Sequence, residues 1–201
     1  MKLKLLTFAA VLLASFAAAM PGAQASTVGF AAIDRSHNDS YSNFALAFTN
    51  QVFSAGTLTK WSTYTGSSGQ LALLVLTPQG GNNYQVAALD VQTVSAGLST
   101  FSASISTLAG QILGVWMGTA KVDYTLLNQP SGPDQYTANL ALGSAPTIGD
   151  LISFGAGSTD RQYSLSATVV PLPAALPLLA SGFGLLGFLG WRGKRKPGAA
   201  I

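Results

Sequence analysis

The chain has 201 residues and no cysteine, and its ten Lys and Arg residues against seven Asp and Glu residues give a formal net charge of +3. Six of these cations lie near the two ends, whereas residues 26–168 contain four cations and seven aspartates. The middle of the chain is therefore acidic, which excludes the clustered basic face of a nucleic-acid-binding protein. Without cysteine the chain cannot be a disulfide scaffold, and a single histidine cannot complete a zinc site.

The first 25 residues have the parts of an export signal. Lys2 and Lys4 form a short positive region, and residues 5–19 form an apolar run. The small residues Ala23 and Ala25 follow this run. The apolar run is shorter than the ~20 residues that a membrane-spanning helix needs. We therefore expect a signal peptide over residues 1–25, which signal peptidase removes by cutting before Ser26.

Between residues 26 and 168 short apolar runs alternate with polar segments that contain glycine and proline. The runs lie at Phe44–Phe48, Leu71–Leu76, Tyr84–Val94, Ile112–Met117, Val122–Leu127, Tyr136–Leu142 and Tyr163–Val170. Other segments, such as Thr57–Trp61, alternate apolar and polar residues with period two, which is typical of strands. The pattern predicts an all-β domain over 26–168, folded as a single jelly-roll-like β-sandwich with a Ser/Thr-rich outer face.

A polar segment contains the only histidine, His37. A nucleophilic enzyme needs a base beside its nucleophile, but no spacing selects a serine partner for His37, and no G-x-S-x-G turn is present. The aspartates are scattered singly, so no carboxylate pair of a glycosidase stands out. We therefore predict no catalytic residues and no enzyme activity.

Calcium is the one metal that this polar segment could hold, because Ca²⁺ takes carboxylate and carbonyl oxygens from loops. Asp34, Asn38 and Asp39 lie within six residues, although their spacing is not that of an EF-hand. We expect no cofactor, and keep calcium at these three residues as an alternative.

Seven aromatic residues are candidates for stacking against a sugar ring. They are Trp61, Tyr64, Tyr84, Trp116, Tyr124, Tyr136 and Tyr163. Aromatic residues also fill the core of a sandwich. We expect Trp61 and Trp116 to lie in the core, and leave the positions of the exposed tyrosines open.

A second apolar segment follows the predicted domain. Prolines keep the chain extended up to about Pro177, residues 176–191 are apolar and uncharged, and a basic flank comes next. The flank consists of Arg192, Lys194, Arg195 and Lys196. Because such charges stay on the cytoplasmic side, we expect a transmembrane helix with the domain outside and the basic tail inside.

The order of these features carries a resemblance to a known sorting signal. Val170-Pro171-Leu172-Pro173, the apolar helix and the basic end resemble the tripartite PEP-CTERM signal of Gram-negative bacteria. Its usual motif is V-P-E-P, so Leu172 stands in place of the glutamate. The resemblance implies that residues 169–201 are a sorting signal and that an exosortase, a membrane protease, removes the tail at the motif.

Three stretches of the domain are similar to exported β-sandwich domains that often precede this signal. They read GTLTKWSTYTG, LALLVLTPQGGNNYQVAALD and AGQILGVWMGTAKVDY, with Gln111 at a position where aspartate is usual. The activity of such domains is mostly unassigned, so this likeness adds to the fold prediction and not to the function.

Two functional hypotheses follow. The preferred one is an exported, non-catalytic cell-surface or extracellular-matrix protein, which is held transiently in the inner membrane, processed, and associated with exopolysaccharide. The alternative is a carbohydrate-binding jelly-roll module that uses surface aromatics and calcium. The expected partners are signal peptidase, an exosortase-type protease, the membrane and extracellular polysaccharide, with no nucleic acid.

Overall fold

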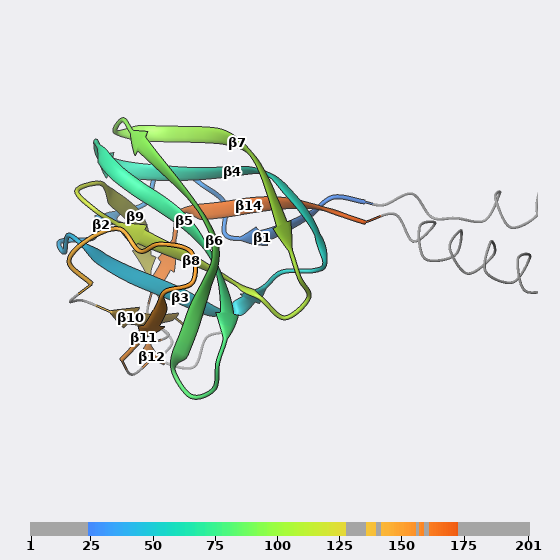
Figure 1. The fold of residues 1–201 in the computed structure, drawn as a ribbon. Coiled ribbons are helices and arrows are strands. Elements are labelled where there is room, and N and C mark those ends of the chain that lie inside the picture. The colour runs from blue at the N-terminus through green and yellow to red at the C-terminus, as the bar shows by residue number, and fades with distance from the viewer. Residues whose placement is uncertain (1–23, 128–135, 140–141, 156, 159–160, 173–201) are drawn as a thin grey trace, which may run out of the picture. The chain divides into compact units, whose positions relative to one another are not determined.

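The computed structural model describes residues 24–127, 136–139, 142–155, 157–158 and 161–172 (Figure 1). Most of the predicted signal peptide and the predicted C-terminal helix lie outside these residues. No helix among the described residues is long and apolar enough to cross a membrane. The described part is built from strands, so the all-β prediction is confirmed.

The strands form two seven-stranded sheets whose pairings are all antiparallel. The first sheet has the order β1-β14-β4-β9-β13, with β7 beside β4 and β2 beside β9. Its strands are β1 (Ser26–Gly29), β2 (His37–Asn38), β4 (Gly56–Ser67), β7 (Gly97–Thr107), β9 (Lys121–Leu126), β13 (Arg161–Tyr163) and β14 (Leu165–Pro171).

The second sheet has the order β11-β6-β5-β8-β3-β10-β12. Its strands are β3 (Phe44–Val52), β5 (Gly69–Pro78), β6 (Asn83–Val94), β8 (Ile112–Met117), β10 (Tyr136–Asn139), β11 (Leu151–Ser153) and β12 (Gly157–Ser158). The chain passes from one sheet to the other between β4 and β5, where Ser68 alone separates two long strands. The two sheets pack in a sandwich-like arrangement (Figure 1).

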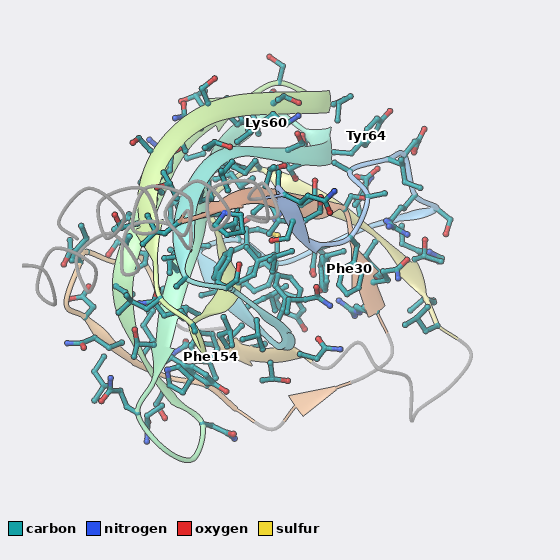
Figure 2. All side chains as sticks on the ribbon, turned by 90° about the vertical axis from the view of Figure 1, so that its right-hand side faces the viewer. Phe30, Lys60, Tyr64 and Phe154 are labelled. Carbon is teal, nitrogen blue, oxygen red and sulfur yellow. The ribbon has the colours of Figure 1, made fainter. Side chains whose placement is uncertain are left out.

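The first sheet alternates as the sequence predicts. Along β4 and β7 apolar side chains such as Trp61 and Leu58 face the core, and many hydroxyl-bearing residues face outward, although Thr63 and Thr65 of β4 are buried. Two of the outward hydroxyls, on Ser62 and Thr100, lie 2.9 Å apart across the β4–β7 pair. Figure 2 shows Lys60 and Tyr64 on β4, at the outer side of this sheet. The predicted Ser/Thr-rich outer face is therefore present here.

The central strands β5 and β8 of the second sheet are buried on both faces. In β5 all side chains from Leu71 to Leu76 are buried, and β8 is buried throughout. One set faces the first sheet, while the other forms a second apolar cluster with Ile152 and Phe154 and with the partly buried Leu142. The segment 142–154 therefore covers the outer face of this sheet, which explains why β5 and β8 contain continuous apolar runs.

The two ends of the domain lie side by side in the first sheet. Ser26 of β1 pairs with Val169 of β14, and β14 pairs on its other side with β4. Strand β14 runs to Pro171, so it extends three residues past the expected end of the domain at Thr168. Val169 is fully buried, and Pro171 is paired with Gly56 of β4. The expected boundary at 168 therefore falls inside a strand.

Candidate functional site

A polar corner forms where the segment before β3 crosses the first sheet. The two residues of β2, His37 and Asn38, pair with Tyr124 and Asp123 of β9. The other edge of β9 pairs with β13, which brings Arg161 and Tyr163 to the same place. We use the name polar corner for the side chains of Arg35, His37, Asp39, Asp123, Tyr124, Arg161 and Tyr163. The sequence places these residues in three separate segments, so their meeting depends on strand pairing.

Asp39 is the buried centre of this corner, with its side chain 2% exposed. The Tyr163 hydroxyl donates a hydrogen bond of 2.7 Å to Asp39 Oδ2, and Arg161 Nη1 lies 3.2 Å from the same oxygen. The Arg161 side chain is 27% exposed, so this ion pair is only partly shielded from water. Because a buried carboxylate needs partners, Arg161 and Tyr163 account for the burial of Asp39.

The Tyr124 ring links the cation to the histidine. The Arg161 guanidinium carbon lies 4.4 Å from the centre of the Tyr124 ring, a cation–π geometry. The His37 ring stacks on the same tyrosine at 5.5 Å between centroids. The exposed His37 also has its Nδ1 2.8 Å from the hydroxyl of Ser36.

This histidine is not part of a catalytic triad in the described residues. His37 and Ser36 are sequence neighbours on the exposed surface, and no described carboxylate is hydrogen-bonded to the other ring nitrogen of His37. A general base needs such an orienting group to hold its tautomer. The arrangement therefore supports a packing role for His37 against Tyr124.

Arg35 closes the other side of the polar corner. Its side chain donates hydrogen bonds to Ser164 Oγ at 2.7 Å and to Gln162 Oε1 at 2.8 Å. The Ser164 hydroxyl donates in turn to the carbonyl oxygen of Ile33 at 2.6 Å. These bonds fasten the segment before β2 to β13 and to Ser164, between β13 and β14. Sequence reasoning missed Arg35 because its partners lie 127 and 129 positions away.

Asp123 is a second buried carboxylate, 2% exposed. Burial raises the pKa of Asp123, and the charge of Asp34 acts in the same direction, whereas the backbone N–H groups of Arg35 and Gly66 and the Arg35 charge lower it. The carboxylate of Asp34 also raises the pKa of the nearby Tyr64. Asp123 therefore has less compensation for its charge than Asp39.

The calcium candidates Asp34, Asn38 and Asp39 have different environments. Asp34 and Asn38 are exposed, whereas Asp39 is buried with one oxygen bonded to Tyr163 and Arg161. Among the described residues there is no group of three or more His, Cys, Asp or Glu side chains that could hold a metal ion. A calcium ion at Asp34 and Asn38 would have to do without this oxygen of Asp39.

Most of the aromatic candidates lie inside the domain. Trp61 and Trp116 are buried as predicted, and Tyr84, Tyr124 and Tyr163 are buried too. Tyr64 is partly exposed, and Tyr136 lies in β10 with its side chain outside the described part. The Trp61 indole N–H donates a hydrogen bond of 2.6 Å to Asp90 Oδ2, which joins β4 to β6 across the sandwich.

The predicted processing residues lie partly within the described structure. Ala25 is exposed directly before β1, which begins at Ser26, and Val170 and Pro171 are the last residues of β14. Leu172 follows with 61% of its surface exposed. Ala23, Pro173, Arg192, Lys194, Arg195 and Lys196 lie outside the described residues.

Comparison with known proteins gives no match. No family model, no curated protein and no solved structure is similar to the chain.

Proposed function

We propose that this protein is exported through its N-terminal signal peptide and held transiently in the inner membrane by its C-terminal helix. In this proposal an exosortase-type protease cuts at Val170–Pro173 and frees the domain for the cell surface or the extracellular matrix. The β-sandwich then acts as a non-catalytic component that associates with exopolysaccharide.

The observation that carries the proposal is the order of the C-terminal features. A Pro-containing motif at 170–173 precedes the apolar, uncharged run at 176–191, and four cations follow within residues 192–196. Each part has a physical role, because proline keeps a segment extended, an apolar run enters the bilayer, and the cations stop translocation. The four cations contrast with an otherwise acidic domain, which supports a sorting role for them.

The positions of the domain ends support the same proposal. Strand β1 begins at Ser26, directly after the predicted signal-peptidase site, and β14 ends at Pro171, within the predicted sorting motif. The paired strands thus begin at the first predicted cut and reach the first two residues of the motif at the second. A domain with these limits can keep its sheet after both end segments are removed.

A non-catalytic role is supported by the polar corner. Its polar groups contact each other: Asp39 contacts Tyr163 and Arg161, and Arg35 contacts Ser164. Such bonds fix the segment before β3 onto the sheet, as expected of groups that stabilise a fold.

The alternative, a carbohydrate-binding jelly-roll module, is favoured by one surface feature. Tyr64 lies on the outward side of β4 opposite the exposed Leu98 of β7, next to the hydroxyl pair of Ser62 and Thr100. A ring beside hydroxyl groups can stack on a sugar and hydrogen-bond it. A glycan array with the wild-type domain and its Tyr64→Ala variant tests this alternative, which requires glycan binding that the variant loses.

The sorting proposal is tested by neutralising the basic flank. Replacing Arg192, Lys194, Arg195 and Lys196 with glutamine should reduce retention in the inner membrane, because each charge costs about 2.5–3.5 kcal/mol at the membrane centre and opposes translocation. Cell fractionation measures the retained fraction. The control is Lys60→Gln, an exposed cation of the domain, which should fractionate like the wild type. Unchanged retention and processing of the neutral-flank variant would contradict a sorting role for the cations.

A further inference from the structure

One side of the sandwich is not closed by strand pairing. Among the described strands, β7 pairs with β4 alone, and β6 pairs with β5 and, at residues 83–85 only, with β11. Strands β6 and β7 belong to different sheets and are joined through Ser95 and Ala96, so their free edges lie next to each other at this connection. Figure 1 shows the two strands separating from it.

Side chains of β6 that face the interior are only half-buried on this side. Asp90 and Gln92 pair with Leu73 and Leu71 of β5, which lie in the core between the sheets. Residues directly opposite each other in an antiparallel pair lie on the same face, so Asp90 and Gln92 also face inward. Their leucine partners are fully buried, whereas both polar side chains are partly exposed.

Strand β7 adds two inward-facing residues to this side. Ser99 and Phe101 pair with Thr63 and Trp61 of β4, which are fully buried. The centroids of the Phe101 and Trp61 rings lie 4.7 Å apart, yet Phe101 is only partly buried. We use the name open side for the side chains of Asp90, Gln92, Ser99 and Phe101.

Asp90 is the one charged side chain of β6 and β7, and it lies at an inward position where the alternating pattern predicts an apolar residue. Trp61 Nε1 donates a hydrogen bond of 2.6 Å to Asp90 Oδ2, and Gln92 Nε2 donates one of 2.8 Å to Oδ1. An ionised carboxylate has about four acceptor positions. The two bonds therefore orient Asp90 and leave acceptor positions for a ligand on the open side.

The open side provides the contacts that a neutral sugar ring needs. A carboxylate accepts hydrogen bonds from sugar hydroxyl groups, and the Gln92 amide and the Ser99 hydroxyl both donate and accept. The Phe101 ring offers an apolar face against which the C–H groups of a sugar can pack. The charge of Asp90 repels an acidic sugar. This combination therefore fits a neutral hexose unit.

We propose that the open side binds the exopolysaccharide, and that it takes a neutral hexose unit whose hydroxyl groups donate to Asp90 while the sugar packs on Phe101. This inference rests on the proposed function and adds to it the contact site and the class of ligand. The site is separate from the alternative one at Tyr64, because Tyr64 faces outward from β4 whereas Phe101 faces inward from β7.

The experiment measures binding of the full chain, in a detergent without a sugar headgroup, to immobilised polysaccharides. The probes are the neutral polymers dextran, mannan and galactan, and the uronic-acid polymer alginate. We expect the wild type to bind at least one neutral polymer, and to bind alginate at least tenfold more weakly. Asp90→Asn keeps an acceptor for Trp61 but removes the charge, and Phe101→Leu keeps an apolar side chain but removes the ring. Each variant should bind the neutral polymer at least tenfold more weakly than the wild type.

Two control variants change the outer face of the first sheet. Ser102 is exposed on the same strand as Phe101, so Ser102→Ala is the matched control, and Tyr64→Ala removes the ring of the alternative site. Both should bind the neutral polymer within about twofold of the wild type. Thermal unfolding checks that each variant is folded. Gln92→Ala, which leaves the bond between Trp61 and Asp90 in place, takes the place of Asp90→Asn where that variant does not fold, and should weaken binding at least threefold.

The outcomes distinguish the inference from the proposed function. Neutral-polymer binding that survives both Asp90→Asn and Phe101→Leu, or that is lost in Tyr64→Ala, overturns the open side as the site but keeps the association with exopolysaccharide. Tighter binding to alginate than to every neutral polymer overturns the proposed class of ligand. Wild-type binding to none of the polymers overturns both the inference and the association, whereas the sorting part of the proposed function is decided by C-terminal processing.

Discussion

Tyr163 donates a 2.7 Å hydrogen bond to Asp39, across 124 positions of the sequence. Both side chains are buried, and Arg161 contacts the same carboxylate oxygen. This contact joins the segment after β2 to β13 and so holds the side chains of the polar corner together. It is an interaction within the domain that accounts for the burial of a charged group.

Removing the hydroxyl of Tyr163 tests this relationship. Tyr163→Phe keeps the ring in the core but removes one hydrogen bond to a charged acceptor, which should lower the free energy of unfolding by about 1.5–3 kcal/mol. Urea unfolding monitored by circular dichroism measures the change.

A double-mutant cycle with Asp39→Asn isolates the contact. If the hydroxyl acts through Asp39, Tyr163→Phe should cost clearly less in the Asp39→Asn background than in the wild type. An equal loss of unfolding free energy in both backgrounds would show that the two side chains stabilise the fold independently. That result would contradict a stabilising contact between Tyr163 and Asp39.

Asp123 should make stability depend on pH in a defined direction. Its pKa is raised in the folded state, chiefly by burial, so the folded protein holds this proton more tightly than the unfolded chain. The stability that Asp123 contributes is therefore greatest at low pH and is lost as the pH rises from the unfolded pKa, about 3.9, through the folded pKa. Asp123→Asn lacks this titration. We expect the stability of the variant relative to the wild type to increase between about pH 3 and pH 7.

Urea unfolding at several pH values checks this expectation. Asp150→Asn is the matched control, because Asp150 is exposed and accepts a hydrogen bond of 2.7 Å from the backbone of Thr147. If the stability of Asp123→Asn relative to the wild type stays constant or falls as the pH rises, the raised pKa of Asp123 is contradicted.

Much of the fold could be predicted from the sequence because its strands are marked by local patterns. The runs at 44–48, 71–76 and 112–117 all lie in strands, and Trp61 and Trp116 are buried. Burial of β5 on both faces was not predicted, because it depends on the distant segment 142–154. The only sign of this burial in the local sequence of β5 is its unbroken apolar run.

The polar corner could not be predicted for a similar reason. The sequence groups Asp39 with Asp34 and Asn38, whereas the structure pairs Asp39 with Arg161 and Tyr163. Long-range strand pairing determines which residues lie next to Asp39. The sequence around an isolated charged residue does not indicate its distant partner. The prolines of the motif indicate a break in the sequence, whereas Pro171 is still paired with Gly56 of β4 in the structure.

The extent of β14 predicts how the domain responds to shortening. A fragment of residues 26–168 loses Val169, which is fully buried, and the pairing of Val170 and Pro171 with β4. Its free energy of unfolding should be about 2–4 kcal/mol below that of a fragment of residues 26–172.

Point variants in the longer fragment provide the control. Val169→Ala should be destabilising by about 1–3 kcal/mol, whereas Val170→Ala, at a position 38% exposed, should cost less than about 1 kcal/mol. Equal stability of the two fragments would show that the residues of β14 after Thr168 do not stabilise the domain.

Calcium gives a further test of the polar segment. Since Asp39 is engaged by Arg161 and Tyr163, we expect millimolar Ca²⁺ to leave the melting temperature of the 26–172 fragment unchanged relative to EGTA. A rise that Ca²⁺ produces in the wild type and that Asp34→Asn abolishes would instead establish calcium binding at this segment.

Intact-mass analysis of the protein recovered from outside the inner membrane tests whether the C-terminal segment is removed. In a host that has an exosortase, we expect a chain that begins at Ser26 and ends at or close to Val170–Pro173, without the apolar run and the basic flank. A recovered chain that still ends in Ile201 would contradict the sorting proposal and leave an ordinary membrane anchor in its place.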